Sequence, residues 1–458
     1  MTGSVFAWKV ETRATIALAW PLILTNLAQV AIGVTDTLML GWLGPDTLAA
    51  GALGANLYWA VFVIGLGLVT STAPLLAQTL GQRRHSLRDC RRTVHQGMWL
   101  AVLLCLPAWA LMWNADPVLR ALGQDASLTG DAQHYLRFMQ WGVLPALGFA
   151  VLRAFIAAHE RPRAGLVVTV AAILLNALLC WLLIFGHAGF PALGMAGAGI
   201  ATTISEIFMF LGLLVFLLLD RRLSRYRLLG GFWRLDLERL RDLLRIGLPM
   251  GLSMGFEVTG INAAAFLCGM IGAQSIAAHA IAIQVASITF MVPLGLAQAA
   301  TVRVGLAAGA GDCGGIGRAG WVAMGLGIGF MAVMAVLLTT EADWVVGLFL
   351  DLDDPAALAV AQIAVPLLAV AGLFQVADGA QVVAAGALRG LKDTRMPMLF
   401  AGLGYWVLAV PLGAALAFPG GMGAHGVWLG LALGLAAVAV LMTVRWSRHR
   451  RLEQVPAV

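Results

Sequence analysis

Long apolar stretches, interrupted by short polar or glycine-rich segments, follow one another along nearly the whole chain. Residues 164–205, 258–302 and 396–444 contain no Asp, Glu, Lys or Arg. A helix that crosses a bilayer needs about 20 mostly apolar residues, so each of these stretches is long enough for two crossings. Each also contains an internal break rich in glycine or proline, which is typical of a hairpin of two helices.

Extended to the whole chain, this pattern predicts twelve transmembrane helices. They are expected at residues 15–42, 49–80, 95–114, 133–157, 164–186, 194–219, 243–271, 276–306, 319–340, 357–388, 397–418 and 423–445. The composition agrees, because 60% of the residues are hydrophobic and only 11% are charged, whereas about a quarter of a soluble chain is charged. We therefore predict an all-α integral membrane protein and exclude a soluble globular or disordered chain.

Charged residues are distributed unevenly between the predicted loops. Basic residues gather at 83–92, 161–163 and 389–395 and at both termini, whereas the loops at 116–131 and 341–354 are mainly acidic. Because Lys and Arg are enriched in cytoplasmic loops, both termini are expected in the cytoplasm. This asymmetry also accounts for the net charge of +6, so no nucleic-acid partner is expected.

A basic segment at 220–242 separates six predicted spans from six others. When the second half is moved back by 228 residues, Pro249 falls on Pro21 and Gly295 falls on Gly67. The same shift places Gly269, Gly272, Ala277, Ala278 and Ala280 on residues of their own type. This agreement between helix breakers and small residues indicates an internal repeat.

The repeat fixes the expected domain organisation. Six spans are an even number, so the two halves have the same orientation in the membrane. Parallel repeats related by an axis along the membrane normal are a transporter architecture, with the binding site between the halves. We predict a six-helix N-terminal lobe at 1–219, a cytoplasmic linker at 220–242 and a six-helix C-terminal lobe at 243–458, related by a pseudo-two-fold axis.

Four acidic residues lie inside predicted spans, namely Asp36, Glu206, Glu257 and Asp378. No Lys or Arg is expected at the same depth, since Arg153 lies near the cytoplasmic end of its span. A charged side chain at bilayer depth costs at least about 2.5–3.5 kcal/mol. Protonation removes this cost, and so does a cation held between carboxylates and neutral oxygens. A site that alternates between these states is an ion-coupling site, although a protonated acid can also simply hydrogen-bond a neighbouring helix.

Uncharged polar residues accompany the acids at helical spacing. The candidates for a polar cavity are Gln29, Thr202, Ser253, Gln284, Gln375 and Gln381, together with the acid Glu206. Met254 is added because methionine suits a pocket that accepts varied apolar shapes, although a methionine-rich face is more often used for packing.

Several short motifs identify the chain more closely. They are Val34–Thr37 and Gly41–Gly44 in the first span, Ile184–Gly186 and Gly194–Thr202 across spans 5 and 6, Pro249 with Glu257 in span 7, Asp378 in span 10, and Leu388–Pro397 after it. Together they resemble the multidrug and toxic compound extrusion (MATE) transporters, in the NorM-like branch. The resemblance covers essentially the whole chain.

The resemblance implies a transporter, not an enzyme, that exports organic cations and amphiphilic drugs across the bacterial inner membrane. Inward Na+ or H+ would drive export, with no other cofactor, while two lobes rock about a central cavity. It implies that Glu257 and Asp378 bind the coupling cation, as the Na+ ligands if the ion is sodium. Asp36 would also take part in coupling and form, with Asn176 and Thr202, the polar centre of the N-terminal lobe. A monomer in contact with lipid is expected.

Two positions depart from the family pattern. NorM-like members often have Tyr one turn before the acid of span 10, where this chain has Phe374, and a second Asn in span 5, where this chain has Cys180. The missing phenol hydroxyl removes one ligand for Na+, so Na+ and H+ both stay open as the coupling ion. The thinner N-terminal polar cluster leaves Glu206 as a candidate to compensate.

One alternative function is a flippase for lipid-linked precursors or polysaccharides in the same superfamily. A flippase of this kind needs cationic residues in its central cavity to hold a diphosphate, whereas these spans carry acids. A membrane-embedded enzyme is disfavoured, because Gly309–Asp312 matches a protease motif only in a predicted cytoplasmic turn.

Overall fold

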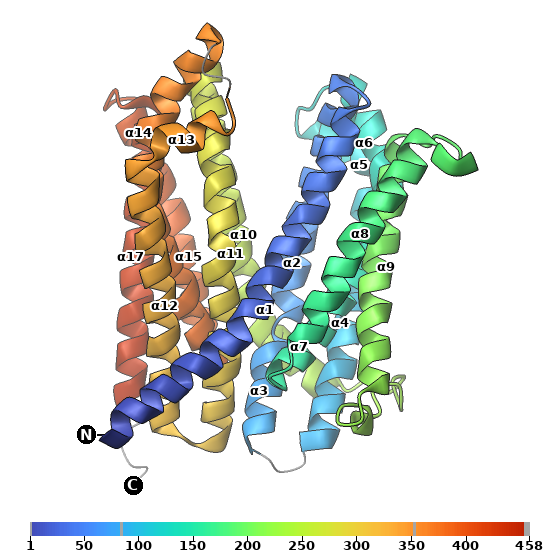
Figure 1. The fold of residues 1–458 in the computed structure, drawn as a ribbon, viewed down its shortest axis with the longest axis vertical. Helices are drawn as coiled ribbons and strands as arrows, with labels where there is room; N and C mark the ends of the chain where they lie inside the picture. The colour runs from blue at the N-terminus through green and yellow to red at the C-terminus, as the bar shows by residue number, and fades with distance from the viewer. Residues whose placement is uncertain (1, 83–85, 351–353, 453–458) are drawn as a thin grey trace. The chain divides into compact units, whose positions relative to one another are not determined.

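The computed structural model describes residues 2–82, 86–350 and 354–452, and the regular elements within them are helical (Figure 1). The helices of the first half are α1 (Thr2–Gly41), α2 (Pro45–Val69), α3 (Thr72–Gln82), α4 (Ser86–Trp113), α5 (Ala115–Ala121), α6 (Ala126–Met139), α7 (Val143–Ala158), α8 (Arg163–Phe185) and α9 (Met195–Leu219). Those of the second half are α10 (Leu237–Ile271), α11 (Ala273–Ala310), α12 (Cys313–Thr340), α13 (Ala342–Gly347), α14 (Pro355–Gly390), α15 (Arg395–Gly402), α16 (Val410–Ala417) and α17 (Gly423–Leu452). Short 3-10 turns form η1 (Gln140–Gly142), η2 (His187–Gly189) and η3 (Ser224–Tyr226), and η4 (Leu403–Ala409) is a π-helix.

All twelve predicted spans are confirmed. Among the described residues, twelve stretches are long and apolar enough to cross a membrane, so the all-α membrane fold class is confirmed as well. Some spans join consecutive elements, as α2 joins α3 and α15 joins α16 through η4. Residues 83–85 and 351–353 of the predicted loops lie outside the described residues. Helix α10 begins at Leu237, so the last part of the predicted linker 220–242 is helical.

The chain folds into two compact units whose borders fall inside helices. One unit, termed the N-unit, contains Leu24–Gly251, and the other, termed the C-unit, contains the residues up to Ile23 together with those from Leu252 onward. The predicted lobes 1–219 and 243–458 do not coincide with these units, because the first part of α1 belongs to the C-unit and the first part of α10 to the N-unit. The two borders are separated by the 228 residues of the sequence repeat.

The first part of α1 and the first part of α10 are termed the exchanged segments, because each belongs to the unit formed mainly by the other half of the chain. Both are packed through equivalent close contacts. In the N-unit, a Cβ atom on Gly67 of α2 would lie 2.8 Å from the backbone nitrogen of Gly251 in α10. In the C-unit, a Cβ atom on Gly295 of α11 would lie 2.9 Å from the backbone nitrogen of Ile23 in α1. Both pairs are related by the repeat offset. Glycine allows helix backbones to approach closely in membranes, so the same contact is built once in each unit.

Charged side chains also fix both exchanged segments. In the C-unit, Arg303 of α11 donates two hydrogen bonds to the carboxylate of Glu11 in α1, from Nε at 2.8 Å and from Nη2 at 2.7 Å. The repeat places Arg239 of α10 at the position equivalent to Glu11. In the N-unit, Arg239 donates from Nε to the hydroxyl of Thr93 at 3.0 Å and from Nη2 to that of Thr79 at 3.4 Å. The position is therefore polar in both halves, although the sign of the charge differs.

Residues 220–236, termed the linker strap, lie against α4 in the N-unit. The side-chain nitrogens of His95, Gln96 and Trp99 lie 2.6, 3.0 and 2.9 Å from the backbone carbonyl oxygens of Leu228, Arg234 and Phe232, respectively. These bonds satisfy carbonyl groups that no regular helix or strand would pair. Most of the segment predicted as a linker is therefore bound to one unit.

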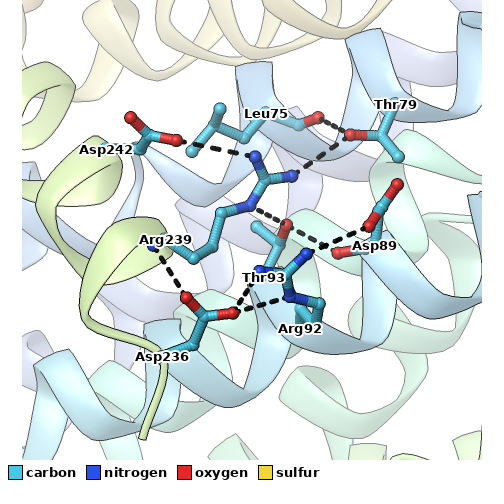
Figure 2. Close-up of polar contacts among 8 residues, drawn as sticks. All are labelled: Leu75, Thr79, Asp89, Arg92, Thr93, Asp236, Arg239 and Asp242. Atoms are coloured by element: carbon cyan, nitrogen blue, oxygen red, sulfur yellow. Dashed lines mark hydrogen bonds and ion pairs between the residues drawn. The ribbon is translucent and has the colours of Figure 1, made fainter.

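Asp236 joins the linker strap to α4 and lies directly before the first residue of α10 (Figure 2). Its Oδ1 accepts a hydrogen bond from the backbone N–H of Arg239 at 3.2 Å, which caps the helix. Its Oδ2 accepts one from Nε of Arg92 at 2.6 Å. Burial alone would raise the pKa of Asp236, but the N–H of Arg239 and the hydrogen bond and charge of Arg92 outweigh burial. The pKa of Asp236 consequently lies below its ordinary value.

The glycine contacts predict an effect of added volume on stability. Replacing Gly67 by Ala should lower the free energy of unfolding by about 1–3 kcal/mol, because the added methyl group meets backbone atoms of α10. The matched control is Gly255→Ala in α10, where a Cβ atom meets nothing within 4 Å. Thermal unfolding in detergent should show a lower melting temperature for the first variant alone. Equal melting temperatures would contradict the close contact.

The linker strap predicts an effect on proteolysis. In Asp236→Asn, trypsin should cut the purified protein several-fold faster at the exposed arginines of the strap, because Arg92 loses its charged partner in the strap and keeps only the more distant Asp89 of its own helix. The folded pKa is lower than the unfolded one, so the carboxylate stabilises the fold at neutral pH and this contribution is lost as the pH falls through the lowered pKa. The control is Asp242→Asn, whose side chain is 50% exposed and lies 3.8 Å from Arg239. Similar cleavage rates in both variants would count against the docked strap.

Candidate functional site

A cavity of about 100 Å³ in the N-unit gathers several of the predicted site residues. Its polar lining consists of Gln29 and Asp36 from α1, Tyr58 from α2, Arg153 from α7, and Thr202 and Glu206 from α9. Four of these six residues were expected from the sequence, and Tyr58 and Arg153 were not. The cavity therefore joins residues that are far apart in the chain but belong to one compact unit.

Asp36 is held by hydrogen bonds from two neighbouring helices. The hydroxyl of Thr202 donates to Oδ2 at 2.6 Å, and the thiol of Cys180 donates to Oδ1 at 3.3 Å. Asn176 is fully buried beside Asp36, but neither of its amide atoms reaches a hydrogen-bond partner within 3.5 Å among the described residues. The predicted grouping of Asp36 with Asn176 and Thr202 is thus present, and Cys180 takes part in it.

Glu206 lies one turn beyond Thr202 on α9. Its Oε2 is buried without a hydrogen-bond partner among the described residues, and its charge interacts with that of Asp36. Besides Asp36, the N-unit therefore holds a second carboxyl group, and one oxygen of this group has no hydrogen-bond partner among the described residues. A buried polar atom of this kind is costly unless a proton or a ligand supplies the missing partner.

Arg153 corrects the expectation that no basic residue accompanies the acids. It lines the same cavity as Asp36 and Glu206. Its Nη1 donates to Oδ1 of Asn26 at 3.0 Å and to Oε1 of Gln29 at 3.1 Å. The position of Arg153 near one end of α7 gave no indication of this, because the partners lie on α1.

The C-unit places the other two acids together. Glu257 lies on α10 and Asp378 on α14, and their carboxyl groups are close enough for their charges to interact. Asp378 is 7% exposed, and its Oδ1 is buried without a hydrogen-bond partner among the described residues. The guanidinium group of Arg389 on α14 also interacts with the charge of Glu257. The two acids predicted as the coupling pair are therefore neighbours.

Tyr405 is a site residue that the sequence analysis missed. It is fully buried, and its hydroxyl interacts electrostatically with both Glu257 and Asp378. The side-chain nitrogen of Gln381 lies 3.5 Å from this hydroxyl. Tyr405 lies on the π-helix η4, and a Cβ atom on Gly260 would lie 2.9 Å from its ring, so the absence of a side chain at Gly260 makes room for the phenol.

A signal for Tyr405 was present in the sequence. The chain has four tyrosines, and Tyr405 stands in the middle of a span without any charged residue. A buried tyrosine hydroxyl usually requires a polar partner, so its occurrence there indicates a polar site. A π-helical segment is also common at functional sites.

The other residues of the C-unit that were predicted to line the site lie in different surroundings. Oε1 of Gln375 accepts a hydrogen bond from the hydroxyl of Thr289 at 3.0 Å. Phe374 is buried against Trp428, with ring centroids 5.4 Å apart. Ser253 is buried, Met254 is half-buried, and Gln284 is exposed without a described contact to the acid pair.

The donor set limits how a cation could be held in the C-unit. Within the described parts of the chain, no group of three or more His, Cys, Asp or Glu side chains is arranged to hold a metal ion. A cation at Glu257 and Asp378 would therefore take its other ligands from neutral oxygens, such as those of Tyr405 and Gln381.

Comparison with known proteins agrees with the internal repeat. The family model MatE matches residues 21–182 and again residues 249–415, so the two matches begin 228 residues apart. The chain belongs to the NorM-like MATE family. The resemblance recognised in the sequence is thereby confirmed.

The similarity of this MATE protein to its relatives extends over nearly its whole length. It is 52% identical to the probable multidrug resistance protein NorM of Mesorhizobium japonicum, over 97% of this chain and 95% of the relative. It is 42% identical to the multidrug resistance protein NorM of Burkholderia vietnamiensis, over 97% of this chain and 95% of the relative.

Solved structures share the fold. The crystal structure of the eukaryotic MATE transporter AtDTX14 aligns with a TM-score of 0.84 and 20% identity, over 98% of this chain and 99% of that chain. A MOP superfamily transporter from Pyrococcus furiosus aligns with a TM-score of 0.87 and 18% identity, over 97% of each chain.

The network around Asp36 in this MATE protein predicts a stability effect. Thr202→Val should lower the free energy of unfolding by about 1–3 kcal/mol, because a buried carboxyl group loses its closest hydrogen-bond donor. Thr202→Ser keeps the hydroxyl and serves as the control. Thermal unfolding of both variants in detergent checks this, and equal melting temperatures for Val and Ser would refute the role of the hydroxyl.

Proposed function

We propose that this chain is a cation-coupled antiporter that exports organic cations and amphiphilic drugs. The observation that carries the proposal is the pair of the half-buried Glu257 and the buried Asp378, in which Oδ1 of Asp378 has no partner among the described residues. Relatives that share about half of its residues are named multidrug resistance proteins. The family assignment and the acid pair both support a transporter whose substrate and driving ion are cations.

The physical basis of coupling is competition for negative charge. Two ionised carboxylates close together in an apolar unit repel each other and are poorly solvated, so at least one must bind a proton or share a cation. A drug cation and the coupling ion satisfy the same requirement. If the pair binds one of them at a time, entry of the ion releases the drug, which is the defining step of antiport.

Both Na+ and H+ fit the neighbours of the pair. A proton requires only a carboxylate removed from water. Na+ prefers several oxygen ligands, and Tyr405 offers a hydroxyl where Phe374 offers none. The structure therefore weakens the argument against Na+ that was based on Phe374, and we propose either ion as the driving ion.

Alternating access is the proposed transport mechanism. Two compact units with equivalent exchanged segments at the starts of α1 and α10 support it, because rocking of parallel repeats opens a site to one side of the membrane at a time. We propose a monomer in the bacterial inner membrane with both termini in the cytoplasm, on the basis of the loop charges.

The flippase alternative is not favoured. The N-unit cavity has two carboxyl groups against one guanidinium group, whereas a lipid-linked diphosphate requires an excess of positive charge. The relatives carry names of multidrug resistance proteins. Catalysis is not part of the proposed function.

The acid pair predicts the effect of isosteric amides. Glu257→Gln and Asp378→Asn should each reduce ion-driven transport of tetraphenylphosphonium at least tenfold, because an amide keeps the shape of the side chain but cannot balance a cation. Transport is measured in proteoliposomes under separately imposed Na+ and pH gradients. The control is Glu341→Gln at an exposed acid between α12 and α13. Wild-type transport by both amide variants would overturn the proposed coupling site.

A further inference from the structure

The linker strap carries five exposed arginines that form no ion pair within the described part of the chain. They are Arg221, Arg222, Arg225, Arg227 and Arg234. The two acids of the strap are bound to arginines outside it. Asp220 accepts a hydrogen bond from Nη1 of Arg161 at 2.6 Å, and Asp236 accepts one from Nε of Arg92 at 2.6 Å (Figure 2). The strap therefore presents positive charges that its own acids do not balance.

Large apolar side chains are exposed on the same segment. Trp233 is 83% exposed, Leu229 is 60% exposed and Leu235 is 47% exposed. The exposed apolar surface continues into both neighbouring helices, because Leu219 at the end of α9 is 76% exposed and Leu237 at the start of α10 is 69% exposed. Single exposed apolar residues are ordinary, but a group of them among charged residues marks an interaction surface.

Other side chains of the linker strap hold it on the N-unit. Leu223 and Tyr226 are buried, with 2% and 4% of their surface exposed. The ring of Phe232 stacks on that of Trp99 in α4, with centroids 6.0 Å apart, and meets the ring of Trp233 edge to face at 5.9 Å. The exposed indole of Trp233 therefore belongs to an ordered aromatic cluster and not to a loose loop.

The contacts with α4 place the strap at the end of the apolar part of that helix. They run from Arg92, which binds Asp236, to Trp99, whose Nε1 donates to the carbonyl oxygen of Phe232 at 2.9 Å. Seven residues separate these two positions, which is about 10 Å along the helix axis. Residues 97–113 of α4 contain no charged side chain. The strap thus covers the depth at which interfacial segments insert their apolar side chains, about 5–10 Å into the boundary between headgroups and acyl chains.

From this arrangement we propose that the linker strap is a binding surface for anionic phospholipids. Its guanidinium groups bind the headgroup phosphates, for which their paired N–H donors are suited. Trp233 and the exposed leucines lie among the first part of the acyl chains, where tryptophan is enriched in membrane proteins. An acidic protein segment would satisfy the arginines but leave the apolar side chains in water, so a lipid is the occupant that uses both. This binding goes beyond the proposed export and does not depend on it.

A general excess of arginine on one side of the membrane makes a different prediction. If the arginines of the strap act only through the overall charge of that side, other exposed arginines there contribute equally. Arg13 of α1, Arg395 of α15 and Arg448 of α17 are exposed and are predicted on the same side as the strap. They provide a control with the same change of charge.

Native mass spectrometry of the full-length protein separates the two explanations. The protein is released from detergent micelles that contain equal amounts of phosphatidylglycerol and phosphatidylcholine, and the bound lipids of each kind are counted. The strap variant combines Arg221→Gln, Arg222→Gln and Arg234→Gln. The control variant combines Arg13→Gln, Arg395→Gln and Arg448→Gln. Melting temperatures without added lipid show whether both variants fold like the wild type.

We expect the wild type to retain phosphatidylglycerol in at least about fivefold excess over phosphatidylcholine, because each arginine near an anionic surface adds to the attraction. The excess should fall below about twofold in the strap variant and stay near the wild-type value in the control variant. Equal losses in both variants, an unchanged excess in the strap variant, or no preference in the wild type would overturn the inference.

A second measurement tests the apolar part and does not require the arginine variants to fold. Cys313 is the exposed cysteine among the described residues, so Cys313→Ser with Trp233→Cys allows a fluorescent label to be attached at position 233. In nanodiscs that contain phosphatidylglycerol, lipids with a spin label near the headgroup should quench this fluorophore at least about twofold. An unquenched label would overturn the inference, and binding of a deca-glutamate peptide by the same protein would then assign the strap to an acidic protein segment.

Discussion

The cost of burying a carboxyl group in an apolar helix bundle is the constraint on which this structure depends. An ionised carboxylate away from water must find hydrogen-bond donors, a cation or a proton. Asp36 receives donors from Thr202 and Cys180, whereas Oε2 of Glu206 and Oδ1 of Asp378 receive none among the described residues. The groups that the fold leaves unsatisfied are the ones on which an exchangeable cation or proton can act.

The repeat determines where such groups can be placed. The 228-residue offset relates the prolines Pro21 and Pro249, the borders of the compact units, and the two matches of the family model. Yet the halves differ in chemistry, because the N-unit combines its acids with Arg153 in one cavity and the C-unit places Glu257 beside Asp378 and Tyr405. A shared scaffold thus carries two different polar sites.

Most of the fold could be predicted from the sequence, because charge-free stretches of about 20 residues and their glycine-rich breaks depend only on local composition. The borders of the two units could not be predicted, because α1 and α10 continue through these borders as helices. The sequence marks them only by the nearby Pro21 and Pro249. For the site, the acids were found because a charge in a span is conspicuous. The positions of Arg153, Tyr405 and Gln284 depend on how separate helices pack, which spacing along one helix does not reveal.

The central claim is that a drug cation and the coupling ion compete for Glu257 and Asp378. The most direct measurement titrates tetraphenylphosphonium into the purified protein in weakly buffered solution near pH 7. Proton release is followed with a pH-sensitive dye, and displacement of bound Na+ with radioactive sodium. The account predicts that binding releases a proton or a sodium ion, and that the double variant Glu257→Gln with Asp378→Asn releases neither. Binding to the wild-type protein without release of either ion would contradict it.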